Sequence, residues 1–128
     1  MAFLNDLVLD SGLAIVAGAS RRLDLCSQLP TTYAGATDTH SLGNKTGITV
    51  PSPESRSPSG RKCVVPAVTS GSPGDVTATG TATHWALSDP GNSRLLAAGT
   101  LSASQSVTNG NTWTTTAAID VGLEGVAS

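Results

Sequence analysis

Apolar and polar side chains alternate along the second half of the chain, between Val76 and Val121. Over residues 76–83 small apolar residues occupy one parity and threonines the other, a period of two that is typical of a β-strand. The alternation returns over residues 101–108 and again over residues 113–121. Together with residues 94–101, which can return antiparallel to the first run, this pattern predicts four successive β-strands.

Two turn sequences separate these strands. Asp89-Pro90-Gly91-Asn92 predicts a type II turn, with Gly91 supplying the positive φ. Asn109-Gly110 predicts a type I′ turn, which would join residues 101–108 and 113–121 as a hairpin. At His84 the alternation slips, and this predicts either a β-bulge or a strand that is buried on both faces towards its end.

Large side chains are scarce, because aromatic residues make up only 3% of the chain. Trp85 and Trp113 are therefore expected to anchor the core, although two exposed tryptophans would instead suit a sugar-stacking platform. The expected core collects the large apolar residues of the inward parities: Trp85, Leu87, Leu95, Trp113, Ile119 and Val121.

The first half of the chain predicts shorter strands. We expect them at residues 23–28, 48–50 and 61–69. Residues 31–47 are rich in turn-forming types and predict a long connection with short edge pairings and no helix, with a tight turn at residues 43–47. About seven short strands predict a mainly β fold, an antiparallel β-sandwich or barrel, over residues 23–128.

Residues 1–22 form a separate N-terminal segment. Leu4, Leu7 and Val8 lie at helical spacing, whereas Gly12 and Gly18 weaken a continuous helix. Two interpretations therefore remain open, a helix of three or four turns and an apolar arm that becomes ordered on a partner.

Composition excludes several classes of partner. Charged residues make up 12% of the chain and the net charge is −2, so there is no basic field for nucleic acid. The first nineteen residues contain two aspartates and no Lys or Arg, which argues against a signal peptide and a membrane span. Cys26 and Cys63 lack paired spacing and are expected to be reduced core residues of a protein made in the cytoplasm.

No motif indicates catalysis. No serine lies in a nucleophile elbow, and His40 and His84 have no second ligand at metal-binding spacing. Glu54 and Glu124 are isolated, so they do not suggest a pair of catalytic carboxylates. We therefore expect no catalytic, cofactor or metal site, and no enzyme.

Several short motifs resemble those of small structural proteins of tailed bacteriophages. They are Leu25-Cys26-Ser27-Gln28, Pro30-Thr31-Thr32-Tyr33, Gly80-Thr81-Ala82-Thr83-His84-Trp85-Ala86, and residues 41–47, 59–62, 101–105 and 110–112. The resemblance covers most of residues 23–121. It implies a component of the virion, either a capsid decoration (cement) protein or a part of the tail or fibre, and it carries over no functional residues.

The expected function is capsid decoration. In this hypothesis a homo-oligomer on the capsid surface binds across subunits of the major capsid protein and stabilises the shell. Phe3, Leu4, Leu7 and Val8 are the expected coat-protein interface, because apolar surface outside a core tends to mark an interface. The alternative is a tail or fibre component, possibly a carbohydrate-binding adhesin module.

Overall fold

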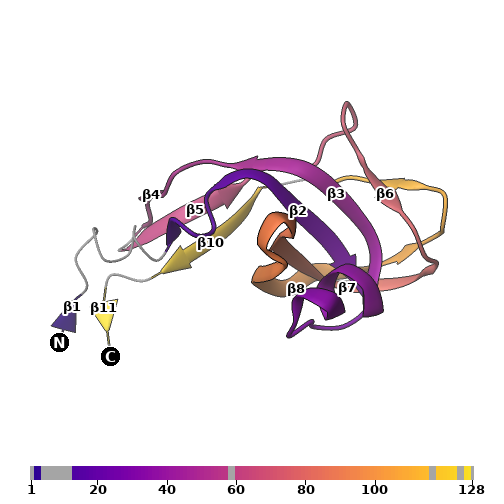
Figure 1. Cartoon of the computed structure of the whole chain (residues 1–128), viewed down its shortest axis with the longest axis horizontal. Coiled ribbons are helices and arrows are strands. Elements are labelled where there is room, and N and C mark those ends of the chain that lie inside the picture. Colours follow the sequence, from indigo (N-terminus) through magenta and orange to yellow (C-terminus); the bar gives the residue numbers. More distant parts are fainter. Residues whose placement is uncertain (1, 4–12, 58–59, 116–117, 124–125, 128) are drawn as a thin grey trace.

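The computed structural model describes residues 2–3, 13–57, 60–115, 118–123 and 126–127. In these residues the fold is mainly β, antiparallel and sandwich-like, which confirms the predicted fold class (Figure 1). The elements in chain order are β1 (Ala2–Phe3), β2 (Gly18–Cys26), the π-helical turn η1 (Gly35–Thr39), β3 (Ser41–Val50), β4 (Glu54–Ser55), β5 (Arg61–Val65), β6 (Gly74–Val76), β7 (Gly80–Asp89), the 3₁₀ turn η2 (Pro90–Asn92), β8 (Arg94–Val107), β9 (Thr112–Trp113), β10 (Ile119–Leu123) and β11 (Val126–Ala127).

One large sheet dominates the structure. Its six strands follow the order β8-β7-β2-β3-β6-β9, and β2 lies inside it, paired with β3 on one side and β7 on the other. A second sheet has the order β10-β5-β4, and β1 pairs with β11. Figure 1 shows the β1–β11 ribbon at one end of the long axis, beyond β5 and β10.

The core lies between the large sheet and β5. Leu23, Val50 and Leu87 contribute from the large sheet, and Cys63 and Val65 contribute from β5. All five are at most 2% exposed, so removing apolar surface from water stabilises the contact between the two sheets.

The predicted core is confirmed in part. Trp113 and Leu87 are buried, while Trp85, Ile119 and Val121 are only partly buried against the same cluster. The prediction for Leu95 is wrong, because Leu95 packs against a separate small cluster formed by Cys26, Ala36 and Ala86. Its neighbours Leu96 and Ala97 pack against the main core, so along this part of β8 side chains contact both clusters and Leu95 belongs to the second one.

The predicted hairpin at Asn109-Gly110 is wrong. Trp113 pairs with Gly74 of β6, and Ile119 pairs with Val65 of β5, so neither partner is β8. A type I′ turn requires positive φ at both central residues, yet only Gly110 has it, at 94°. The Gly110 N–H instead donates to the Val76 carbonyl at 3.0 Å, which directs the chain towards β6.

The other predictions for this region are mixed. β7 and β8 do pair antiparallel, and the ladder shifts register between Ala82 and His84, where a bulge was predicted, although the extra residues belong to β8. The alternative is observed as well, because residues 86–89 at the end of β7 are all buried. The turn after Asp89 is at the expected place but is a 3₁₀ turn, and its left-handed residue is Ser93 (φ 49°) instead of Gly91.

The connection predicted over residues 31–47 is also wrong. β3 is a ten-residue strand in the interior of the large sheet, and η1 is a helical turn where none was expected. Gly43 is not a turn residue here: a Cβ at this position would lie 2.6 Å from the Asp75 carbonyl oxygen. Glycine is therefore needed because the backbones of β3 and β6 approach closely.

The N-terminal prediction is only partly tested. β2 begins at Gly18, five residues earlier than expected, and one helical turn precedes it, closed by the Ala17 N–H donating to the Leu13 carbonyl at 3.1 Å. Arg21 completes this turn by donating to the carbonyls of Val16 (3.1 Å) and Ala17 (2.6 Å). Residues 4–12 of the predicted helix or arm lie outside the described residues.

Both cysteines are buried thiols, as predicted. Cys26 lies on β2 and Cys63 on β5, which belong to different sheets. Burial raises the pKa of the Cys26 thiol to about 12, so this sulfur is a poor nucleophile at neutral pH.

A charged network lies inside the fold at Asp24, whose side chain is fully buried. Arg22 donates to both carboxylate oxygens, at 2.8 and 2.9 Å, and the Ser41 hydroxyl donates at 2.7 Å. Arg22 also donates to the Thr37 carbonyl at 3.1 Å and so ties η1 to β2. Burial raises the pKa of the Asp24 carboxyl, while these hydrogen bonds act in the opposite direction.

Replacing Arg22 tests this network. Arg22→Met leaves the buried carboxylate of Asp24 without its cation, and we expect the free energy of unfolding to fall by about 3 kcal/mol at neutral pH. Because the folded-state pKa of Asp24 is then raised further above its unfolded value, the folded protein binds the proton more tightly. The decrease in the free energy of unfolding caused by Arg22→Met should therefore be smaller at about pH 4 than at about pH 7.

Urea unfolding of wild type and variant at both pH values measures this difference. Lys45→Met is the control, because the Lys45 ammonium donates to Ser72 at the protein surface and its loss should change stability by less than about 0.5 kcal/mol. An equal loss in Arg22→Met at the two pH values would contradict the assigned role of Asp24.

Candidate binding groove

Each tryptophan of this protein lies opposite a glycine on the neighbouring strand. Trp85 of β7 pairs with Gly99 of β8, and Trp113 of β9 pairs with Gly74 of β6. A Cβ at Gly99 would come within 2.8 Å of the Trp85 indole, and one at Gly74 would overlap the Trp113 indole. Both indoles therefore pack directly on the backbone of the neighbouring strand, and only glycine at the opposite position leaves room for them.

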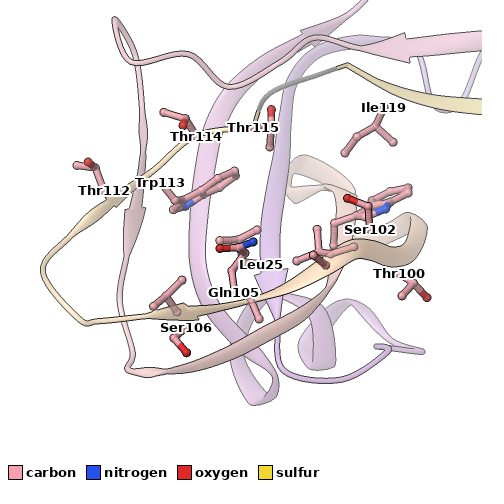
Figure 2. Close-up of a pocket in the computed structure, with 15 residues that line it drawn as sticks. Leu25, Thr100, Ser102, Gln105, Ser106, Thr112, Trp113, Thr114, Thr115 and Ile119 are labelled. Carbon is pink, nitrogen blue, oxygen red and sulfur yellow. The ribbon is translucent and has the colours of Figure 1, made fainter.

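The two tryptophans line one groove of about 560 Å³. Figure 2 shows it between the second half of β8 and the segment that carries Trp113. Its apolar lining consists of Leu25, Ala82, Trp85, Leu101, Ala103, Val107, Trp113 and Ile119. Its polar lining consists of Thr100, Ser102, Gln105, Ser106, Thr112, Thr114 and Thr115.

A large bulge shapes one wall of the groove. In the β7–β8 ladder Ala82 pairs with Gln105 and His84 pairs with Thr100, so Thr83 alone stands opposite residues 101–104. These four residues leave the regular ladder, and three of them line the groove. Bulges of this kind redirect side chains and interrupt pairing, and they are frequent at binding sites.

The polar groups of the groove differ in whether they already have partners. Trp113 donates its indole N–H to the Asp75 carbonyl at 3.2 Å, which fixes the ring. Thr115 accepts from the Val68 N–H at 2.8 Å. Within the described part of the chain the Trp85 indole N–H and the Gln105 side-chain amide have no hydrogen-bond partner. Gln105 is exposed and therefore accessible to a ligand, whereas Trp85 Nε1 lies against the backbone at Gly99.

Of the predicted interface residues the structure describes Phe3, while Leu4, Leu7 and Val8 lie outside the described residues. Phe3 belongs to β1, which pairs with β11 and does not contribute to the groove. Sequence reasoning proposed the tryptophans as core or as a sugar platform; in the structure Trp113 is 7% exposed, Trp85 is partly buried, and both line the groove.

The histidines have structural partners. His40 Nε2 lies 3.1 Å from the Gln28 amide nitrogen, and His84 Nδ1 lies 2.8 Å from the Thr83 hydroxyl. Among the described residues no group of three His, Cys, Asp or Glu side chains could hold a metal ion. The same residues contain no helix that is long and apolar enough to cross a membrane.

Comparison with known proteins adds no relative. No protein-family model, no curated protein and no solved structure matches this chain. The inference of function therefore depends on the residues of the chain itself.

Removing Trp113 tests how the groove is supported. Trp113→Ala should lower the free energy of unfolding by about 3–5 kcal/mol, because it deletes a buried indole and leaves a cavity above Gly74. Trp85→Ala is the comparison and should cost less, since Trp85 keeps part of its surface in water. Urea unfolding measures both losses. An unchanged midpoint for Trp113→Ala would show that its indole does not support the fold.

Proposed function

We propose that the chain is a non-enzymatic structural protein of a tailed-phage virion, a capsid decoration (cement) protein that binds across subunits of the major capsid protein. The motif resemblance between residues 23 and 121 supports this class of protein. The observation that carries the docking part of the proposal is the β1–β11 ribbon, which brings the two ends of the chain together.

The ribbon is too short to be stable by itself. Among the residues that the structure describes, two pairs define it, Ala2 with Ala127 and Phe3 with Val126. An isolated two-stranded ribbon is marginally stable in water even when it is longer. A coat-protein surface that covers this end would supply the missing stabilisation. The apolar residues Phe3, Leu4, Leu7 and Val8 belong to the same part of the chain and would form the contact.

Assembly on a shell does not require a tight individual contact. An interface of about 800 Å² per partner is enough for specific binding, and repetition around a symmetry axis adds avidity. A protein that binds the assembled shell but not the free coat subunits stabilises the shell by linkage. A weakly charged domain, with a net charge of −2, limits repulsion between copies displayed at high density.

A deletion tests the docking end. We expect a variant lacking residues 2–12 to fold, since the core lies in the two larger sheets, and to bind emptied mature capsids of its phage at least about tenfold more weakly. A second variant, with Leu4, Leu7 and Val8 changed to serine, leaves β1 in place. Co-sedimentation measures binding, and the capsid melting temperature measures protection against heat.

Gln105→Ala is the matched control, because it changes the groove and leaves the termini intact; it should bind capsids like wild type. Full binding and protection by both N-terminal variants would rule out docking through this end. Failure of the intact protein to bind capsids, with binding to purified tails, would move the assignment to a tail or fibre component.

A further inference from the structure

The groove presents hydrogen-bonding groups over an apolar floor, at a distance from the terminal ribbon. Figure 2 shows Gln105 rising from β8 into the space between this strand and the segment of Trp113. Gln105 is exposed, and its amide offers both a donor and an acceptor. Ser102 and Thr114, also exposed, add hydroxyl groups at the rim. These polar groups line the same groove and do not hydrogen-bond to one another, as in a preformed binding site.

The lining carries no charge. None of the fifteen residues around the groove is Asp, Glu, Lys, Arg or His. An ionised ligand would lose hydration here without gaining a counter-charge, which is costly. The groove therefore selects an uncharged ligand with many hydroxyl or amide groups.

The aromatic floor adds a second requirement. The Trp85 indole lies over Gly99 and remains partly exposed in the groove. The face of an indole carries negative partial charge and attracts the slightly positive C–H groups of a flat, partly apolar ligand. A sugar ring combines such a C–H face with a rim of hydroxyls, so it satisfies both the floor and the rim.

From these features we infer that the groove binds a short neutral saccharide. Trp85 is the stacking platform, and Gln105, Ser102 and Thr114 contact the hydroxyls. The volume of about 560 Å³ falls within the range of about 300–1,000 Å³ that small-molecule sites occupy. This site is separate from the proposed capsid-binding end and goes beyond the proposed function.

A peptide strand is the competing occupant, because β8 is an edge strand. Strand addition needs a regular row of backbone donors and acceptors on the edge. The bulge at residues 101–104 interrupts that row where β8 lines the groove. A ligand in the groove therefore contacts side chains more than the backbone edge of β8.

The experiment titrates the intact protein with a panel of neutral di- and trisaccharides built from glucose, galactose, mannose, rhamnose and N-acetylglucosamine. Tryptophan fluorescence and saturation-transfer NMR report binding. We expect at least one saccharide to bind with a Kd below about 10 mM. Lactose and sialyllactose form a matched pair, and the charged member should bind no better than the neutral one.

Two variants assign the contacts. Gln105→Ala, at an exposed position that leaves folding intact, should weaken binding about fivefold, the usual worth of neutral hydrogen bonds. Trp85→Leu should weaken it further, provided that circular dichroism shows a folded protein. Gln28→Ala is the control, since this amide lies against His40 away from the groove and its loss should leave binding unchanged.

Three outcomes would overturn the inference: no saccharide of the panel binds, binding is equally strong in Gln105→Ala and wild type, or binding is displaced only by an extended peptide. None of these outcomes bears on capsid binding, which the N-terminal variants test separately.

Discussion

The packing of each tryptophan on a glycine of the adjacent strand is the constraint on which the large sheet depends. A chain with so few large side chains fills its interior by laying two indoles flat against backbone. Gly74 and Gly99 make this possible, and Gly43 lets β6 come close enough for the Trp113 indole N–H to reach the Asp75 carbonyl. The same packing places both rings along one groove, so support of the fold and shaping of the groove are linked.

The local pattern predicted the β7–β8 pair, but it did not predict η1 or the strand at residues 41–47. The alternation and turn residues around β7 and β8 gave two antiparallel strands and the bulge at His84, because adjacent strands joined by a short turn pair with little loss of entropy. Pairings between distant strands could not be predicted in this way. Trp113 joins β6 instead of β8, and Gly43 resembles a turn residue although it serves a close contact between strands.

Some residues of the site could be predicted from the sequence, but their arrangement could not. Sequence reasoning named Trp85 and Trp113 and both of their possible roles, but the groove exists because β8 and the segment after β9 face each other, which no periodicity encodes. Sequence reasoning did not single out Asp24, because its environment depends on Ser41 and on η1, which are brought to it only by the fold. A carboxylate inside an otherwise apolar strand, two residues after Arg22, was the available signal.

The pairing of Ala2 with Ala127 has a consequence for the order of folding. The two large sheets lie between these residues in the sequence, so their contact closes a very long loop. Such a contact is entropically expensive and forms late. During synthesis β1 therefore has no β11 to pair with until the strands between them have been made.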